Sequence, residues 1–307
     1  MKKLLFGCMC VCLTALAASL VAGCGGGGDE SAPDPATGRL SLSVTDAPVD
    51  SATAVVVRFT AVELKPEGRA AFTITLDSPQ SIDLLELAGG SSRALLEERE
   101  VPAGRYEWLR LIIEARQNEN VSYLDLEDGT RYPLFVPSGS ESGLKLIRGF
   151  TVAQGSSSDF TIDFDLRKSV IAPPGLSPNY LLKPVLRMVD NLRVGSIAGV
   201  VAPALVTADC APQVYVFSGA GVTPDDLDSA GSPDADPLVS VPVELDTATG
   251  DYRYRAAFLE AGDYTISFTC DGDLDSPEGE ETLTFVGTRD ATVTANQTTT
   301  IDFTPAT

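Results

Sequence analysis

The eight residues DFTIDFDL, Asp159–Leu166, carry the pattern that decides the fold class. Every second residue is apolar: Phe160, Ile162, Phe164 and Leu166. Side chains alternate between the two faces of a β-strand, so this spacing places the apolar residues on one face and the polar residues on the other. The stretch therefore predicts a strand with one face against a hydrophobic core.

Strand patterns also fill both flanks of this stretch. AVVVRFTAVEL at 54–64 is a β-branched run long enough for one bent strand, and SYLDLEDGTRYPLFV at 122–136 places the turn EDGT between two short strands. Helical patterns are confined to Leu84–Leu87 and Ser92–Glu98. Short strands separated by Gly, Pro and Asp are typical of a sandwich or barrel.

The strand pattern starts again after residue 190. About seven strands follow in about 110 residues, the size and strand number of an immunoglobulin-like sandwich. We predict an all-β chain of two β-sandwich domains, at residues 38–194 and 195–307. The connection at 219–237 is acidic and rich in Ser, Pro and Ala, so we expect it to be mobile.

The amino terminus has the features of a secretory signal. Lys2 and Lys3 precede an apolar run at Leu4–Ala18. The VAGC that follows at 21–24 resembles a bacterial lipobox, in which the cysteine becomes the first residue of the mature chain and carries the lipid. The competing interpretation is an uncleaved transmembrane helix, because Leu4–Ala22 is long enough to span a bilayer.

The lipobox resemblance implies a location for the protein. Residues 1–23 form the signal peptide, and Cys24 binds membrane lipid through several acyl chains such as palmitate, which hold a protein more firmly than one chain does. Residues 24–37, rich in Gly, Ser, Pro and Asp, form a flexible tether. We therefore expect a lipid-anchored protein of the cell envelope, and Gly25 favours the outer membrane.

Charge and the missing histidine exclude several classes of protein. The chain has 43 acidic and 22 basic residues, and residues 197–307 hold 19 acids against three arginines. Such a surface repels phosphate backbones, so we expect no nucleic-acid partner. The absence of histidine excludes Ser-His-Asp catalysis and His-ligated zinc. A carboxylate-only hydrolase would use Glu63, Glu86, Glu107 or Glu114, whose spacing brings no two together.

The cysteines predict one disulfide. Four of the six lie in the signal segment or at the lipidated position. Cys210 and Cys270 remain, and an even pair in an oxidising compartment is expected to be bonded. Two buried free thiols are the alternative.

The segment DGDLDSPEGEE contains candidate metal ligands. Asp271, Asp273 and Asp275 alternate like the first ligands of a calcium loop. Ser276 stands where the helix–loop–helix calcium motif needs glycine, and Thr282 stands where it needs glutamate. The alternative is a solvated acidic hairpin tip.

Asp46, in the sequence DAP, is a candidate ligand or metal contact, with Asp163 and Asp165 as companions. A carboxylate ahead of proline also caps its own turn. Arg167 and Lys168 follow the two companions closely, so solvated ion pairs are the alternative role for these aspartates.

Two regions resemble known families. The first carries five elements in order: GRLSLSVTDAPVD at 38–50, VPAGRYEWLRLII at 101–113, LFVPSGSESGLKLIRGF at 134–150, TIDFDLRKSVI at 161–171 and YLLKPVLRMV at 180–189. Together they resemble the bacterial domain of unknown function DUF4382, which occurs in secreted lipoproteins. GSIAGVV at 195–201 and ATGDYRYRAAFLEAGDYTISF at 248–268 are similar to carboxypeptidase regulatory-like domains, which implies a prealbumin-like sandwich. Neither resemblance brings catalytic residues.

These features together predict a non-enzymatic binding, adhesion or structural module at the cell envelope. Its partner would be a protein or glycan at the cell surface, and no cofactor is expected. The alternative is a calcium-dependent polysaccharide-binding component of a cell-surface complex.

Replacing Cys24 with serine tests the anchor, because a hydroxyl cannot form the thioether that holds the lipid. We expect palmitate labelling to fall to background and the protein to leave the membrane fraction. Cys12→Ser, inside the signal segment, is the matched control and should keep both properties. An unlabelled wild-type chain that stays in the membrane at full length would favour the uncleaved helix instead.

Overall fold

The computed structural model describes residues 36–47, 52–136, 143–172, 178–183, 185–228, 235–277 and 279–305. The signal segment, Cys24 and the tether up to residue 35 lie outside these residues. Residues 35–307 form one compact unit. Within the described part of the chain, no helix has the length and apolar character needed to cross a membrane.

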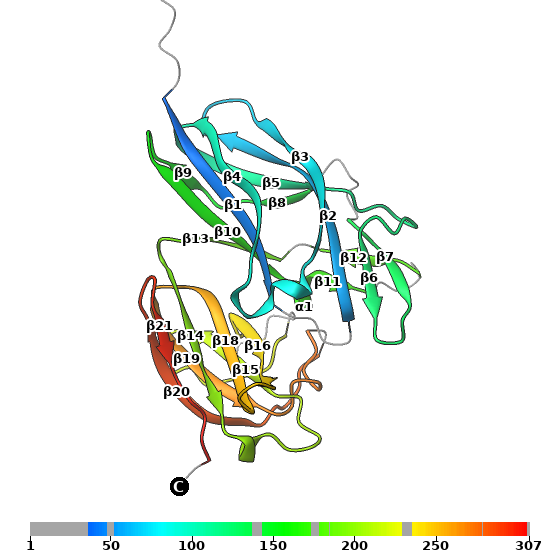
Figure 1. The fold of residues 1–307 in the computed structure, drawn as a ribbon, viewed down its shortest axis with the longest axis vertical. Helices are drawn as coiled ribbons and strands as arrows, with labels where there is room; N and C mark the ends of the chain where they lie inside the picture. The colour runs from blue at the N-terminus through cyan, green and yellow to red at the C-terminus, as the bar shows by residue number, and fades with distance from the viewer. Residues whose placement is uncertain are drawn as a thin grey trace, which may run out of the picture. The chain divides into compact units, whose positions relative to one another are not determined.

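Two sheets are built from the first half of the unit (Figure 1). One has the strand order β13 (Leu186–Asp190), β10 (Ser157–Asp165), β1 (Thr37–Ala47) and β4 (Arg93–Pro102). The nine strands of the other are β2 (Ala52–Pro66), β3 (Phe72–Asp83), β5 (Gly104–Ile113), β6 (Tyr123–Leu126), β7 (Arg131–Phe135), β8 (Leu144–Leu146), β9 (Phe150–Val152), β11 (Val170–Ile171) and β12 (Tyr180–Leu182). The long bent strand and the EDGT hairpin are confirmed as β2 and the antiparallel pair β6–β7.

The octapeptide lies in the middle of the first sheet. β10 pairs in parallel with β1 and antiparallel with β13, so Figure 1 shows the green β10 beside the blue β1. All four apolar residues of the octapeptide are at most 8% exposed. The opposite face is also partly covered, because Thr161 is fully buried and donates a hydrogen bond to Asn191 Oδ1 at 2.9 Å. A central strand with neighbours on both sides explains this covering.

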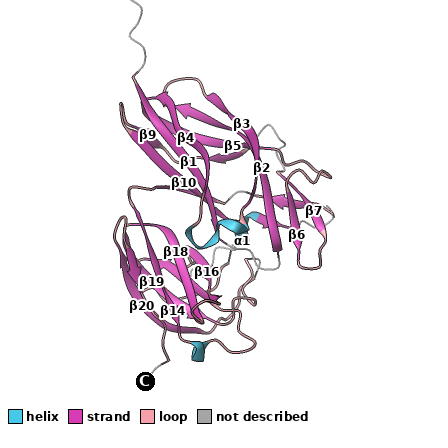
Figure 2. Ribbon diagram, viewed as in Figure 1, coloured by secondary structure: helices cyan, strands magenta, loops and turns pink. Residues whose placement is uncertain are grey.

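The helical prediction at Ser92–Glu98 is wrong. Residues Arg93–Pro102 form β4, which pairs antiparallel with β1 through two register shifts. Pairing with β1 and burial of Leu95 and Leu96 outweigh the local helix propensity of the Ala, Leu and Glu residues. The other helical prediction corresponds to a short 3₁₀ helix, η1 (Leu85–Gly90). Helix is a minor component of the described residues, as Figure 2 shows.

Two four-stranded sheets are built from the second half of the unit. Their strands are β14 (Val194–Val201), β15 (Gln213–Ser218), β16 (Val239–Pro242), β17 (Glu244–Asp246), β18 (Asp251–Glu260), β19 (Gly262–Thr269), β20 (Phe285–Val293) and β21 (Thr298–Thr300). The orders are β17-β18-β14-β21 and β16-β15-β19-β20, and a 3₁₀ helix, η2 (Pro203–Leu205), follows β14. The all-β prediction is confirmed.

The buried apolar residues form two separate clusters. One cluster runs from Leu40 to Met188 in sequence, and the other runs from Ile197 to Phe303. A sandwich buries the facing sides of its two sheets, so two clusters supply one core to each pair of sheets. The division into domains near residue 194 stays a proposal that these clusters support. At the other boundary, Thr37, expected in the tether, is the first residue of β1.

The predicted disulfide is present. Cys210 and Cys270 are bonded at an S–S distance of 2.04 Å and are separated by 60 residues. The isolated bridge between Ala211 and Asp271 continues the contact on the next residue of each segment. The bond therefore holds the segment before β15 against the segment after β19.

Opening this disulfide should weaken the second half of the unit. Replacing Cys210 and Cys270 together with serine frees a loop of about 60 residues, which costs about 4 kcal/mol of unfolding free energy in the chain-entropy model. Urea denaturation of the double variant measures the loss. Reductant should lower the wild-type midpoint to that of the variant and leave the variant unchanged; a wild-type midpoint insensitive to reductant would contradict the assignment.

Candidate functional site

A buried arginine forms the most connected polar cluster of the described residues. Arg167 lies in the single-turn helix α1 (Leu166–Ser169), and its side chain is 5% exposed. Its Nη1 donates to Asp275 Oδ2 at 2.8 Å, and its Nη2 donates to the Asp275 carbonyl oxygen at 2.7 Å. Ser240 Oγ accepts a third hydrogen bond at 3.1 Å. The ion pair joins residues 108 positions apart in the chain.

Local hydrogen bonds position this arginine at the end of β10. Asp165 caps α1 by accepting a hydrogen bond from the Lys168 backbone N–H at 3.2 Å. Ser169 Oγ accepts another from the Val185 N–H at 3.0 Å. The strand therefore ends in a fixed turn, which directs Arg167 toward Asp275.

Tyr215 and Leu227 complete the contacts of the Asp275 carboxylate. The Tyr215 hydroxyl donates to Oδ2, and the Leu227 N–H donates to Oδ1 at 2.9 Å. Burial raises the pKa of Tyr215 far above its ordinary value, so the hydroxyl remains a donor. A guanidinium and two further donors therefore hold this buried carboxylate.

The structure separates Asp46 from its predicted companions. Asp46 lies opposite Phe164 in the β1–β10 register and is 6% exposed, so it shares the core face of that sheet. Asp163 is one position away and points to the other face. Burial raises the pKa of Asp163, and its ion pair with Arg187 at 2.6 Å opposes that rise.

The ion pairs expected between the aspartates at 163 and 165 and the basic residues at 167 and 168 are therefore wrong. Asp163 pairs with Arg187 across β10 and β13, while Arg167 pairs with Asp275. Tertiary contacts, and not sequence proximity, choose these partners. Burial also raises the pKa of Asp165, whose role is the α1 cap. The alternative turn-capping role of Asp46 involves Pro48, which lies outside the described residues.

The three alternating aspartates of the DGDLDSPEGEE segment have three different environments. Asp271 Oδ2 accepts a hydrogen bond from the Thr284 N–H at 2.7 Å. Asp273 is exposed, and Asp275 is buried with Arg167. The described carboxylates that come within 4.8 Å of one another in groups of three include only Asp275 of this trio. The structure does not gather the trio as calcium ligands.

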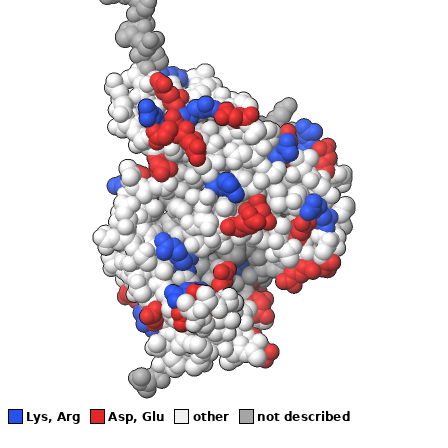
Figure 3. All heavy atoms as spheres, viewed as in Figure 1, with Lys and Arg blue, Asp and Glu red and all other residues white. Residues whose placement is uncertain are grey.

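Three of the four glutamates considered for a hydrolase have their own cation: Glu63 with Arg110 at 3.0 Å, Glu107 with Lys65 at 3.9 Å and Glu114 with Arg58 at 2.8 Å. Glu86 is exposed in the first turn of η1. Figure 3 shows basic and acidic side chains next to one another on the face in view. Three of the four candidate carboxylates are therefore engaged in ion pairs.

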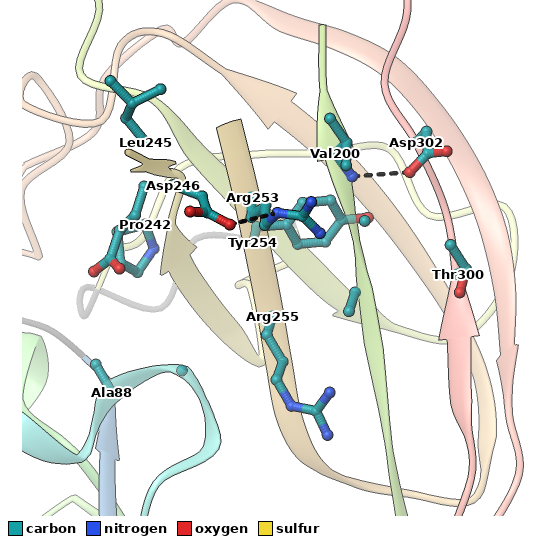
Figure 4. Close-up of a pocket in the computed structure, with 14 residues that line it drawn as sticks. Ala88, Val200, Pro242, Leu245, Asp246, Arg253, Tyr254, Arg255, Thr300 and Asp302 are labelled. Carbon is teal, nitrogen blue, oxygen red and sulfur yellow. Dashed lines mark hydrogen bonds and ion pairs between the residues drawn. The ribbon is translucent and has the colours of Figure 1, made fainter. Parts of the chain in front are cut away.

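A cleft of about 770 Å³ lies over the β14, β17, β18 and β21 sheet, with Ala88 of η1 at its edge (Figure 4). Arg253 pairs with Asp246 at 3.2 Å, and Asp302 accepts a hydrogen bond from the Val200 N–H at 2.8 Å. Arg255 is exposed and forms no ion pair with a described residue, as its position in Figure 4 illustrates. The cleft therefore contains Arg255 as an uncommitted cation, meaning one without an ion pair to a described residue, beside apolar and polar lining residues.

Sequence reasoning missed the cleft and most of the Arg167 cluster. Asp226, Leu227 and Asp228, from the connection expected to be mobile, are 1%, 4% and 3% exposed. Two of the three contact residues about 50 positions later: the Leu227 N–H donates to Asp275 Oδ1 at 2.9 Å, and the Glu281 N–H donates to Asp226 Oδ2 at 2.6 Å. The acidic composition of this segment predicts exposure to solvent, so these buried contacts could not be predicted from the local sequence.

Comparison with solved protein structures finds only weak likenesses. A leucine-rich repeat protein from Bacteroides thetaiotaomicron is 13% identical with a TM-score of 0.21, over 88% of this chain and 26% of that one. A putative cell adhesion protein from Parabacteroides distasonis is 12% identical with a TM-score of 0.22, over 87% and 93%. The minor pilin of Streptococcus agalactiae is 10% identical with a TM-score of 0.19, over 87% and 97%.

These likenesses carry neither a fold nor a function to this chain. The chain spans only 26% and 33% of the first two structures matched, the repeat protein and the TIE protein of Bacillus anthracis. No curated protein matches the chain significantly. The carboxypeptidase-like resemblance of the second half stays a prediction. Residues 37–184 match the family model described as a domain of unknown function (DUF4382), which confirms that resemblance for slightly less than half of the chain.

Removing the buried guanidinium should destabilise the protein strongly. Arg167→Met leaves Asp275 buried without a cation, which costs about 3 to 5 kcal/mol of unfolding free energy. Arg148→Met is the matched control, since the Arg148–Glu260 pair is about half exposed and such pairs contribute at most about 1 kcal/mol. Urea denaturation measures both variants, and adding Asp275→Asn to Arg167→Met should recover part of the loss. Equal effects of the two single variants would contradict a special role for the buried pair.

Proposed function

We propose that this protein is a non-enzymatic adhesion or structural module of the bacterial cell envelope, held by lipid on Cys24. The cleft over the β14–β18 sheet is its contact site. The match of residues 37–184 to DUF4382 supports the part of this proposal that concerns secreted lipoproteins. The outer membrane is the proposed location.

The uncommitted Arg255 carries the proposal of a contact site. Residues 197–307 hold 19 acids and only three arginines, so almost every cation there is expected to be neutralised by a neighbour. Arg253 follows this expectation through Asp246 and Asp251, at 3.2 and 2.5 Å. Arg255, two residues along β18, does not. A guanidinium with free donors at the wall of a cleft is available to a ligand carboxylate or hydroxyl.

The lining suits a ligand with both polar and apolar surface. Leu245 is 49% exposed and lies in the same cleft as Thr300 and Asp302, which add hydrogen-bonding groups. Pockets that combine apolar walls with a few polar groups are the usual form of binding sites. The acidic surroundings disfavour polyanions, so a neutral chain such as a glycan or a peptide fits better.

The ion pairs of the candidate carboxylates support a non-enzymatic role. Glu63, Glu107 and Glu114 each have a basic partner, and the absence of histidine removes the commonest general base. The cleft itself contains Asp246 and Asp302, of which the first pairs with Arg253 and the second accepts the Val200 N–H. Binding without chemistry is the simplest use of such a cleft.

Polysaccharide binding is the second candidate function. Glycan hydroxyl groups both donate and accept hydrogen bonds, and Arg255, Thr300 and Asp302 offer both types of partner in one cleft. The calcium-dependent form of this hypothesis also needs a cation site.

Adhesion of cells that display the full chain tests the proposal. Arg255→Ala combined with Leu245→Ser alters two cleft residues and should lower the number of cells adhering to a monolayer of the same strain lacking the gene. A tenfold loss in the affinity of the cleft for its partner corresponds to about 1.4 kcal/mol for the two substitutions together. Arg39→Ala, at an exposed arginine of β1, is the control and should adhere like the wild type.

Equal adhesion of the cleft variant and the wild type, at equal surface amounts, would overturn the contact site. Binding of the purified full chain to immobilised dextran, lost in the cleft variant, would favour the polysaccharide function. Loss of adhesion without dextran binding would favour a protein partner.

A further inference from the structure

A group of three carboxylates lies beside the Arg167 cluster, away from the residues that line the cleft. Asp226 comes from the connection after β15, while Asp275 and Glu281 come from the segment between β19 and β20. One carboxylate oxygen of each residue lies within 4.8 Å of the others. The first two residues are buried, and Glu281 is half-buried. Two segments about 50 residues apart therefore bring three acids together.

Asp226 has an unsatisfied oxygen inside this group. The residue is 1% exposed, its Oδ2 accepts the Glu281 N–H at 2.6 Å, and its Oδ1 has no hydrogen-bond partner. A buried carboxylate oxygen without a partner is costly, because burial removes the water that would solvate it. Such an oxygen, in a residue whose carboxylate lies within 4.8 Å of two others, points to a bound cation.

The charge of the group matches a divalent ion. Asp226 and Glu281 form no ion pair with any residue in the described ranges, whereas Asp275 pairs with Arg167. Three carboxylates and one guanidinium leave two negative charges. Asp225 and Glu280 form a second group with Asp226, again within 4.8 Å.

The donor atoms favour calcium among the divalent ions. All the ligands are oxygens, which suit a hard cation, and the chain has no histidine to favour zinc. Calcium binds oxygens at about 2.3 to 2.6 Å in a flexible geometry and accepts several protein carboxylates. Magnesium requires near-ideal octahedral geometry and usually keeps several waters, so a set of three protein carboxylates suits calcium better.

We propose that Asp226, Asp275 and Glu281 bind one calcium ion. The ion ties the connection after β15 to the segment before β20. It also fixes Asp275, which holds Arg167. The site is independent of the proposed adhesive function, because its residues do not line the cleft. It differs from the loop pattern of Asp271, Asp273 and Asp275, since it keeps only the last of these.

Calorimetric titration of the EDTA-treated full chain with calcium chloride tests the site. We expect one calcium ion per chain and a higher melting temperature in calcium, by about 5 °C or more at a hundredfold excess over the dissociation constant. Asp226→Asn and Glu281→Gln should each weaken binding at least about tenfold, since each removes a charged ligand. Asp273→Asn, an exposed acid of the same segment, is the matched control and should bind like the wild type.

Melting in EDTA separates a metal ligand from a residue needed only for folding. Asp226→Asn should melt above the wild type in EDTA, because it loses an unpaired buried charge, and it should lose the rise with calcium. No heat and no melting shift for the wild type at about 10 mM calcium, well above the weakest extracellular sites, would overturn the proposal. So would unchanged calcium binding in both variants, or magnesium binding as tight as calcium binding.

Discussion

The buried ion pair between Arg167 and Asp275 is the contact on which the arrangement of the second half depends most. A charge removed from water must meet an opposite charge and enough hydrogen bonds, or the fold loses several kcal/mol. Asp275 satisfies this requirement with Arg167, Tyr215 and the Leu227 N–H. The pair thereby links α1, β15 and two connecting segments.

The acidity of residues 197–307 has two distinct structural consequences. Some carboxylates, such as Asp273, are exposed and contribute solubility and repulsion of anionic partners. Others, such as Asp226 and Asp275, are turned inward and need donors or cations. The same composition therefore produces a surface that repels anions and buried carboxylates that need a cation or hydrogen-bond donors. Arg167, from outside this acidic region, is the cation that pairs with one of them, Asp275.

Strand predictions succeeded where the alternation of residues was strong and failed where local propensity opposed pairing. The first seven residues of the octapeptide lie in β10 and Leu166 begins α1, and all four apolar residues are buried, because a two-residue period has few alternative structures. Ser92–Glu98 has the composition of a helix, yet most of it lies in β4 because β1 offers an unpaired edge. A short stretch of sequence contains no information about which distant strand it will pair with.

The sequence by itself determined the all-β class, the pairing of Cys210 with Cys270 and the lack of histidine chemistry, because these follow from periodicity, count and composition. Only the tertiary structure decided the partner of each charge. Asp163 meets Arg187, and Arg167 meets Asp275, through strand register and chain crossings that span up to 108 residues. The connection at 219–237 was expected to be mobile, yet its Asp226 is buried in a group of three carboxylates. Such contacts depend on proximity in three dimensions, which no local sequence pattern encodes.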